Sequence, residues 1–413
     1  MNNSAGQAER KISVLVIYAG LIPSVEISVL IPLRYLAQQG KIDLVAGAAG
    51  ELNLKAVLPQ CDLVVFSRCC MPHEYIVLDY VRQLNIPYVY DIDDNFFRLA
   101  EAKEPTQMFL QQEGVLDNLR AFISYAQLVK TGSEQLRQDM QAYNRNIVIH
   151  PYVFDFELIS ERTPFSKDEE GKIVIGYAGS LVHSKDLKNI TDALASIARK
   201  YAPRVRFEFY GAKPEQSGKL DPKLLEISTF IRYQPDYASF IRDVSGRGWD
   251  IALAPLADNI ANRSKTNNKY REYAACGIAG VYSNMPVYQS CVVDGENGML
   301  ADYTCQSWTE KIEELICNEE LRKRITSNAY LDVRKNNHID AVARKWYEDI
   351  ILPYALDKKR YSIELRKKQL RKLRTVYTLR QYVNMSGKGK LQLLIIGIKS
   401  LAKKMLREKG VKK

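Results

Sequence analysis

Short apolar runs alternate with helix-spaced segments along the first half of the chain. The runs are nearly continuous, which is typical of strands covered on both faces of a parallel sheet. The pattern predicts strands at 12–18, 44–46, 63–66, 88–90, 128–131 and 147–149, and helices at 27–38, 75–84 and 134–143. Strands and helices in this order indicate a doubly wound α/β domain.

The same pattern starts again after a polar stretch at 163–172. It predicts strands at 173–177, 205–210, 251–253 and 278–282, and helices at 187–201 and 237–244. A chain of 413 residues exceeds one ordinary core, so two facing α/β domains are expected. Ligands of such sheets bind beyond the carboxyl ends of the strands, which predicts a site in the cleft between the domains.

One segment of the second half has the features of an anion site. Ser264 can cap a helix, and Gly277 can end that helix in a left-handed conformation. An anion at the helix N-terminus would meet free N–H groups and a partial positive charge. Arg263, Lys265 and Lys269 add three cations at the same place.

A carboxylate follows in the same segment. If the helix starts near Lys265, Glu272 lies about two turns later on the same side. There it can accept hydrogen bonds from two neighbouring ribose hydroxyls. A capped surface helix with solvated lysines is the simpler alternative for this segment taken alone.

Charge is distributed unevenly along the chain. Residues 357–413 contain 19 Lys and Arg against three Asp and Glu, whereas residues 1–356 contain 40 and 45. The cleft domains are therefore mildly acidic, and no nucleic-acid partner is expected. Leucines among the cations of the tail predict an amphipathic segment that lies on an anionic membrane. Packing on the protein itself and binding of RNA are the alternatives for this tail.

The cysteines and the N-terminus bear on localisation. Seven cysteines occur without a CxxC spacing, which predicts neither a disulfide framework nor a zinc site. The first eleven residues are polar, and no window reaches the roughly 18 apolar residues of a spanning helix. We expect a cytoplasmic protein, either free or peripheral on the cytosolic face of the inner membrane.

Three carboxylates follow the predicted strand 88–90. Asp91, Asp93 and Asp94 have a spacing that could hold a metal, but carboxylates that line the cleft are favoured. One of them could act as a base on a ligand hydroxyl or bind such hydroxyls. Capping of the next helix is the alternative.

Two histidines follow predicted strands. His73 and His183 could each contact a ligand in the cleft. A structural role is the alternative for each.

Further motifs occur in a fixed order. The second half carries the glycine loop Gly176-Tyr-Ala-Gly-Ser180 with Lys185 after it, a strand ending at Pro255, Glu272-Tyr-Ala-Ala-Cys-Gly277 and Asp294-Gly-Glu-Asn-Gly298. The first half carries Tyr90-Asp-Ile-Asp-Asp-Asn95 and Thr131-Gly-Ser-Glu-Gln-Leu136. Over roughly residues 11–350 this series resembles the GT-B-fold glycosyltransferases of family 4, also called group 1. The segment 90–95 is similar to that of a bacterial subgroup with a DIDD sequence.

The resemblance implies an organisation and an activity. It implies a Rossmann-like acceptor-side domain at 1–162, a Rossmann-like nucleotide-sugar donor domain at 163–340, a helix at 341–356 that returns to the first domain, and the basic tail 357–413. The implied activity is metal-independent transfer of a hexose-like sugar from a nucleoside diphosphate to a glycan or lipid-linked acceptor, in cell-surface polysaccharide synthesis. No cofactor is expected, because the nucleotide sugar is a substrate. A catalytically degenerate nucleotide-sugar or glycan-binding protein is the alternative.

The resemblance also assigns roles to residues. Lys185 and Lys265 would stabilise the negative charge that grows on the leaving phosphate, and Glu272 would hold the ribose. No metal ligand is expected. The remaining predicted donor-binding residues are Gly179, Ser180, His183, Arg263 and Lys269. On the acceptor side, Asp94 would act as a base on the acceptor hydroxyl, and His73, Asp91 and Asp93 would contact the acceptor.

The chain departs from the family at two positions. The family pattern has two glutamates eight residues apart, and the earlier one, which contacts the donor sugar in relatives, falls at Ser264. The arginine often found after the donor-loop glycine falls at Ser180. The sugar therefore cannot be inferred from standard members, and Arg263, Lys265 or Lys269 would take over phosphate neutralisation.

Overall fold

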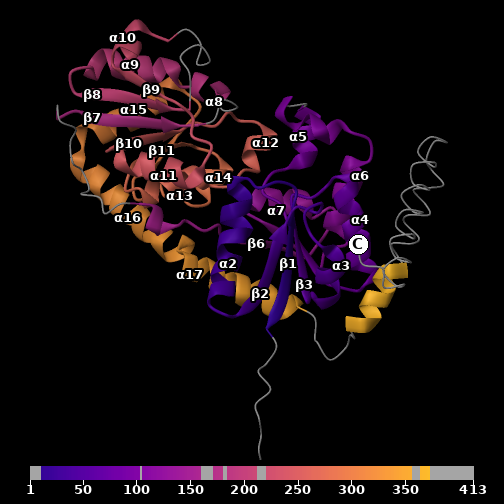
Figure 1. Ribbon diagram of the computed structural model, residues 1–413. Helices are drawn as coiled ribbons and strands as arrows, with labels where there is room; N and C mark the ends of the chain where they lie inside the picture. The colour runs from indigo at the N-terminus through magenta and orange to yellow at the C-terminus, as the bar shows by residue number, and fades with distance from the viewer. Residues whose placement is uncertain are drawn as a thin grey trace, which may run out of the picture.

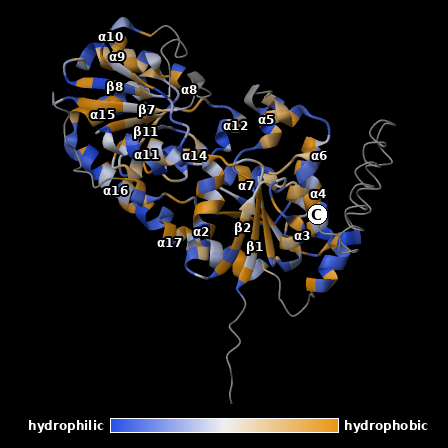
Figure 2. Ribbon diagram, in the orientation of Figure 1, coloured by the Kyte–Doolittle hydropathy of each residue, from blue (hydrophilic) through white to orange (hydrophobic). Residues whose placement is uncertain are grey.

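The structure is a computed structural model that describes residues 11–102, 105–159, 171–179, 184–211, 220–355 and 363–372. These residues form two parallel six-stranded sheets, each flanked by helices (Figure 1). The predicted pair of α/β domains is confirmed. Figure 2 shows apolar residues concentrated along the strands, as expected of sheets that are buried on both faces.

The first sheet has the strand order β2-β1-β3-β4-β5-β6, and all neighbours are parallel. Every residue of β3 is buried, which explains its continuous apolar run. The direction of strand succession reverses between β1 and β3, which makes this the switch point of the sheet. The strands are β1 (Ile12–Tyr18), β2 (Ile42–Gly47), β3 (Leu63–Ser67), β4 (Tyr88–Asp91), β5 (Leu128–Thr131) and β6 (Ile147–Ile149).

The second sheet has the order β12-β11-β10-β7-β8-β9, with its switch point between β7 and β10. Two of its strands, β9 and β12, were not predicted, because they are short and lie at the edges. The strands are β7 (Ile173–Ala178), β8 (Val205–Tyr210), β9 (Ser228–Ile231), β10 (Ile251–Ala254), β11 (Ala279–Ser283) and β12 (Met299–Ala301).

Helices of the first domain connect successive strands. The predicted helix 27–38 begins earlier and has a π-helical turn in its first part, Glu26–Leu30. The α-helices are α1 (Pro23–Val25), α2 (Ile31–Gln38), α3 (Leu54–Val57), α4 (Pro72–Gln83), α5 (Phe96–Ala102), α6 (Val115–Ser124) and α7 (Glu134–Met140). Short 3-10 turns occupy Leu58–Gln60, Pro105–Gln111 and Phe156–Leu158.

Helices of the second domain continue into a segment that returns to the first. Trp346, in the returning segment, is fully buried in the first-domain core. The helices are α8 (Ser184–Lys188), α9 (Thr191–Tyr201), α10 (Pro222–Glu226), α11 (Tyr237–Gly246), α12 (Ile260–Arg263), α13 (Asn268–Ala275), α14 (Pro286–Gln289), α15 (Cys305–Cys317), α16 (Glu319–Asn337), α17 (Ile339–Lys345), a π-helical turn Trp346–Ile351 and α18 (Leu352–Tyr354).

The two chain crossings between the domains lie against each other. The first follows β6, and the second is the break at His338 between α16 and α17. The Asn337 side chain donates to the Tyr152 carbonyl at 2.8 Å, and the Phe154 N–H donates to the Asn337 carbonyl at 2.8 Å. These bonds fix one end of the interdomain cleft.

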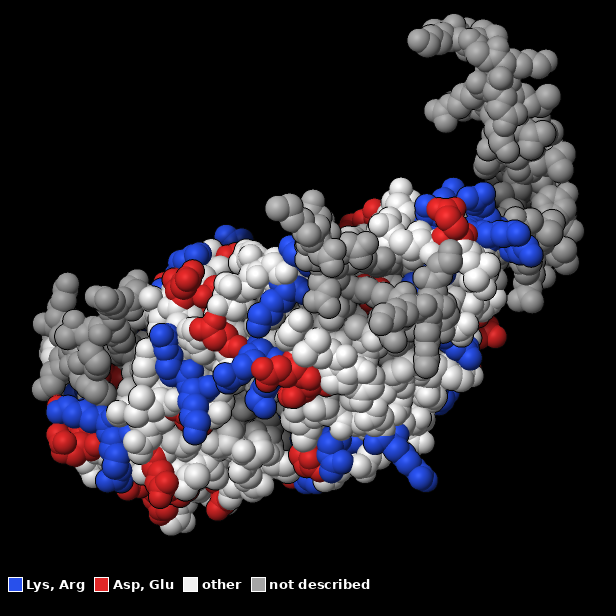
Figure 3. Space-filling model, turned by 90° about the horizontal axis from the view of Figure 1, so that it is seen from below, with Lys and Arg blue, Asp and Glu red and all other residues white. Residues whose placement is uncertain are grey.

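Residues 363–372 form a helix that packs on the first domain. Leu370 is buried in the first-domain core, and Arg366 donates to the Cys61 carbonyl at 2.9 Å. Figure 3 shows Lys and Arg side chains gathered on the surface where this helix lies. Across the described ranges, none of the helices combines the length and the apolar character needed to cross a bilayer.

Candidate active site

A cavity of about 370 Å³ lies between the two domains, within the size range of small-molecule sites. The first domain contributes Pro23, Ser24, Ile27, Asp93 and Asp94 to its lining. The second contributes the carboxyl ends of β7 and β10, at residues 177–179 and 254–256, together with the start of α13. The cavity therefore lies at the switch point of the second sheet, where ligands of such sheets bind.

Helix α13 aims its N-terminus at this cavity. Asn267 is its N-cap, so the expectation that Ser264 caps this helix is wrong. Gly277 has the predicted left-handed conformation, with φ of 67°. The Ile278 N–H closes the helix end on the Tyr273 carbonyl at 2.9 Å. Because the helix starts at Asn268, its open N–H groups meet the cavity beside Lys265.

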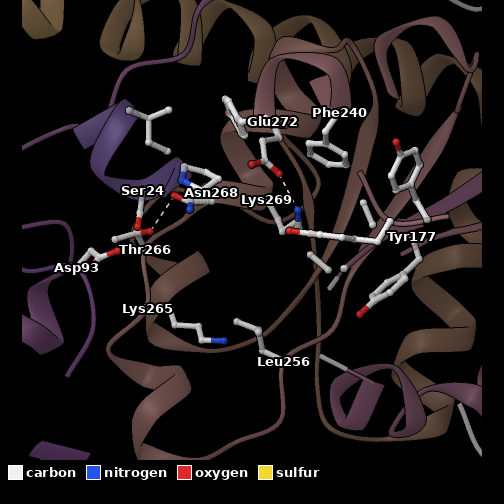
Figure 4. A pocket seen from close by; sticks show the side chains of 18 of the residues that line it. Ser24, Asp93, Tyr177, Phe240, Leu256, Lys265, Thr266, Asn268, Lys269 and Glu272 are labelled. Carbon is white, nitrogen blue, oxygen red and sulfur yellow. Dashed lines mark hydrogen bonds and ion pairs between the residues drawn. The ribbon is translucent and has the colours of Figure 1, made fainter. Parts of the chain in front are cut away.

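Lys269 and Glu272 form an ion pair in the cavity wall (Figure 4). Lys269 Nζ lies 2.7 Å from Glu272 Oε2, and it lies over the rings of Phe240 and Tyr273 at 5.3 and 5.9 Å. Because the helix starts at Asn268, Lys265 lies before it and is not two helical turns from Glu272 as predicted. Lys269, one turn before Glu272 at i and i+3, is its partner instead. Lys269 therefore neutralises and orients Glu272, and this reduces its capacity to neutralise a phosphate.

The other two predicted cations of this segment differ in position. Lys265 lines the cavity, and Figure 4 shows its side chain extending into the space apart from the Lys269–Glu272 pair. Arg263 lies outside the lining and is half exposed. Its guanidinium holds Asp258 through two bonds, at 2.6 and 2.8 Å. Of the two, only Lys265 is placed to meet a ligand in the cavity.

The glycine loop after β7 reaches the cavity at Gly179. A Cβ atom there would collide with the Tyr177 hydroxyl, so any larger residue would have to displace the Tyr177 side chain. Lys185 lies in α8, but its side chain falls outside the described structure, and so do Ser180 and His183.

Asp186 ties α8 to the loop after β10. Its buried carboxylate accepts from the Ala257 N–H at 2.7 Å and from the Asn262 amide at 3.2 Å. The loop that begins at Ala257 leads through α12 to Lys265. The two segments that carry the predicted catalytic lysines are therefore joined directly.

The acidic segment after β4 divides into two parts. Asp93 and Asp94 line the cavity, and both pair with Arg68, the latter at 3.1 Å. Burial would lower the pKa of Arg68, but these two ion pairs outweigh it and raise that pKa. Arg68 has φ of 61°, a left-handed conformation that is uncommon outside glycine. The charged Arg68 guanidinium therefore holds both Asp93 and Asp94 in place at the cavity wall.

Asp91 points into the core instead. It is 1% exposed and accepts from Ser28 at 2.8 Å, Ser67 at 2.7 Å and Lys130 at 2.8 Å. Burial lowers the pKa of Lys130, and the ion pair with Asp91 opposes that shift. Asp91 does not line the cavity, so the structure gives it a place in the fold and not beside an acceptor.

His73 also lies away from the cavity. It stands in the first turn of α4 with its side chain 64% exposed, 3.9 Å from Glu74. Among the residues that the structure describes, no group of three or more His, Cys, Asp or Glu side chains is arranged to hold a metal ion.

The D-G-x-N-G turn supports α13 from behind. The Asn297 amide donates to the Tyr270 hydroxyl at 2.9 Å, and that hydroxyl donates to Asp332 at 2.6 Å. The Asn297 side chain also accepts from the Val293 N–H at 2.7 Å, which fixes the turn. None of the turn residues is among those that line the cavity.

The sequence did not predict the aromatic residues that line the cavity. They are Tyr177, Tyr210, Tyr233, Tyr237, Phe240 and Tyr288. Nor did the sequence predict Ser24, Thr266 and Asn268. Tyr210 ends β8, and Ser24 stands a few residues beyond β1. Position at the carboxyl end of a strand was the available signal for these two, whereas Tyr233 follows the unpredicted strand β9.

Residues 172–318 match the family model described as glycosyl transferases group 1. The second domain is a glycosyl transferase group 1 domain. The resemblance inferred from the motifs of the second half is thereby confirmed, and this match supports transferase activity. No curated protein matches the chain.

Solved structures share the two-domain GT-B fold with this chain. Anabaena HepE, crystallised with UDP and glucose, is similar over 83% of this chain and 99% of its own, with a TM-score of 0.59 at 16% identity. A sucrose-phosphate synthase from Thermosynechococcus elongatus has a TM-score of 0.60 at 14% identity, covering 83% and 100%. A glycosyltransferase from Rickettsia africae has a TM-score of 0.58 at 13% identity, covering 83% and 98%.

Proposed function

We propose that this glycosyltransferase moves a sugar from a nucleoside-diphosphate donor to a hydroxyl of a glycan or lipid-linked acceptor, without a metal ion. The cavity carries the proposal. Its second-domain wall presents a helix N-terminus and Lys265, and its first-domain wall presents Asp93 and Asp94. Cationic and acidic groups therefore face each other across a space of suitable size for a nucleotide sugar.

The second-domain wall of the cavity, called the donor wall below, fits the chemistry of a departing nucleotide. When the sugar–phosphate bond breaks, negative charge grows on the leaving phosphate while the sugar becomes oxocarbenium-like. The N–H groups of α13 and the Lys265 ammonium, which border the cavity, would stabilise that charge. Glu272, held by Lys269, would accept hydrogen bonds from the ribose. Lys185, from α8, would add a further cation.

The first-domain wall of the cavity, called the acceptor wall below, fits the binding of a hydroxyl group. The Asp94 side chain is 30% exposed and keeps its orientation through Arg68. A carboxylate so placed can accept a hydrogen bond from an attacking hydroxyl and take its proton as the new bond forms. Asp93 is more buried and more tightly held, which suits it to positioning.

HepE, crystallised with UDP-glucose as well as with UDP, makes uridine nucleotides the first donors to test. A panel of nucleoside-diphosphate sugars should be screened for protection against thermal unfolding. A ligand at 100 times its dissociation constant adds about 2.7 kcal/mol to the free energy of unfolding. Release of the nucleoside diphosphate should then be measured with acceptor glycans, with and without EDTA.

The outcomes separate the candidate functions. Protection by one donor with turnover that survives EDTA supports the proposal. Protection without release of nucleoside diphosphate from any donor would instead support a nucleotide-sugar-binding protein. Absence of protection by every donor would contradict the proposed substrate class.

We also propose that the basic C-terminal region contacts an anionic membrane. Within the helix 363–372, Lys367 and Arg371 line a second cavity together with Lys55 of α3. Lys367 and Arg371 are part of the net positive charge of residues 357–413, and Lys55 adds one further cation beside them. Each cation near an anionic surface contributes about 1 kcal/mol. Exchange of Lys55, Lys367 and Arg371 for glutamate should reduce sedimentation with phosphatidylglycerol vesicles, whereas unchanged sedimentation would contradict this surface.

A further inference from the structure

The cleft has a direct bridge between its two walls. Ser264 belongs to the second domain, and its side chain is fully buried. Its hydroxyl donates to Asp139 Oδ2 in the first domain at 3.1 Å. Its carbonyl accepts from the Ser133 hydroxyl at 2.7 Å. Both first-domain partners belong to α7, one as its N-cap and one in its last turn.

The same carboxylate oxygen also holds the acceptor wall. The Asn95 amide donates to Asp139 Oδ2 at 2.7 Å. Asn95 directly follows Asp94, and Ser264 directly precedes Lys265. One oxygen atom therefore accepts one hydrogen bond from each wall of the cavity, next to the two residues that face each other across it.

Neighbouring contacts also join the two domains at this point. A Cβ atom at Gly132 would collide with the Thr266 methyl group, so the two domains touch there without a side chain between them. The Gln135 amide donates to the other oxygen of Asp139 at 3.1 Å and fixes its orientation. A carboxylate that accepts three oriented donors is a rigid point in the structure.

We propose that Asp139 is a positioning residue that sets the separation of the two cavity walls, and so places Lys265 opposite Asp94. Ser264 is its counterpart in the second domain. This inference rests on the proposed function for its consequence in catalysis. The assignment also explains the serine at this position, because a longer side chain there would part the two domains.

The test uses the full-length protein with substitutions on α7. Asp139→Ala removes the acceptor of both walls, and we expect kcat/KM to fall about tenfold with the donor found by screening. That loss corresponds to the charged hydrogen bonds removed. Asp139→Asn keeps one amide oxygen for the two donors and should retain activity within about threefold. Glu134→Ala, on the same helix but exposed and paired with Arg137, is the matched control and should leave kcat/KM unchanged.

Two further measurements separate positioning from general destabilisation. Ser264→Ala should cause a similar loss, and the double variant with Asp139→Ala should be no worse than the single variants, because both remove one bridge. Small-angle scattering of the ligand-free Asp139→Ala protein should show a larger radius of gyration than wild type and Glu134→Ala.

The results decide the inference independently of the donor. Additive losses, or failure of Asp139→Asn to restore activity, would overturn it. If no nucleoside-diphosphate sugar is turned over by wild type, the proposed function fails, and scattering alone decides the bridge. An unchanged radius of gyration in Asp139→Ala would then overturn it, and an increased one would support it.

Discussion

Two lysine–carboxylate pairs lie close to the cleft, and they differ in what surrounds them. Lys130 and Asp91 are fully enclosed, and Asp91 also accepts bonds from Ser28 and Ser67. Lys269 and Glu272 border the cavity, at the first turns of a helix that points into it. The N–O distances are similar, 2.8 Å in the first pair and 2.7 Å in the second. The first pair has its partners inside the fold, whereas the second faces a space that a ligand can fill.

The difference shows how burial divides the roles of similar residues. A pair closed off from solvent can only contribute to the fold, because no ligand reaches it. A pair in a cavity wall keeps one side for a ligand, and its partner serves to orient it. Sequence spacing does not distinguish the two, since each carboxylate lies in or beside a motif. The predictions below test the contrast in order of decreasing effect.

Removal of the enclosed carboxylate should have the largest effect on stability. Asp91→Ala leaves the Lys130 ammonium buried without its counter-ion, which typically costs about 3–5 kcal/mol. Urea unfolding should show that loss. A double variant, Asp91→Leu with Lys130→Met, should recover much of the stability, because the buried charge is then absent. A loss below about 1 kcal/mol in Asp91→Ala would show that solvent reaches this pair.

Removal of the cavity carboxylate should affect turnover more than stability. Glu272→Ala should lower kcat/KM about a hundredfold, equivalent to about 2.7 kcal/mol, because the ribose loses its acceptor. Glu226 pairs with Lys223 at the same i, i+3 spacing on an exposed surface, so Glu226→Ala is the matched control. Near-normal turnover in Glu272→Ala, with the protein folded, would contradict the site.

The contrast also shows which features could be predicted from the sequence. The continuous apolar runs predicted the two sheets, because strands buried on both faces leave that pattern. The segment 265–272 was found because a helix N-terminus with cations is a local feature. The division between Asp91 and Asp94 could not be predicted, since it depends on Lys130 and Arg68, which approach from β5 and the loop after β3.

The hydrogen-bonded bridge at Asp139 likewise could not be predicted from the sequence. Its partners Asn95 and Ser264 are 44 and 125 residues away along the chain. The Asn95 contact forms only when the first domain folds, and the Ser264 contact forms only when the two domains meet. The same reason explains why Ser264 was assigned to a helix cap, whereas Asn267 occupies the N-cap position in the structure.

A pH titration should sharpen the description of the enclosed pair. Burial, then the nearby Lys130 charge, holds the pKa of His150 well below its usual value of 6.5. The unfolded chain therefore binds a proton near pH 6.5 that the native protein does not bind, and stability is lost as the pH falls below that value. Between pH 7.5 and 5.5 we expect a loss of about 1.4 kcal/mol.

The measurement is urea unfolding at both pH values, compared between wild type and His150→Gln. The variant should lack this part of the pH dependence, whatever its stability at pH 7.5. His73→Gln serves as the control, because that side chain is largely exposed. Equal pH dependence in wild type and His150→Gln would mean that His150 titrates normally and that the core around Lys130 is open to solvent.

The smallest effect is expected at a third ion pair, which lies on the surface. Arg263 and Asp258 are bonded at 2.6 Å, yet both side chains are 40% exposed or more, and neither residue lines the cavity. Exposed pairs contribute little to stability, because water and salt screen the two charges. Arg263→Ala should therefore leave kcat/KM within about twofold, whereas Lys265→Ala, two residues away, should lower it at least tenfold. Steady-state kinetics with the same donor compare the two variants directly. A greater loss in Arg263→Ala than in Lys265→Ala would reverse the assignment, because it would mean that Arg263 leaves Asp258 for the phosphates when the donor binds.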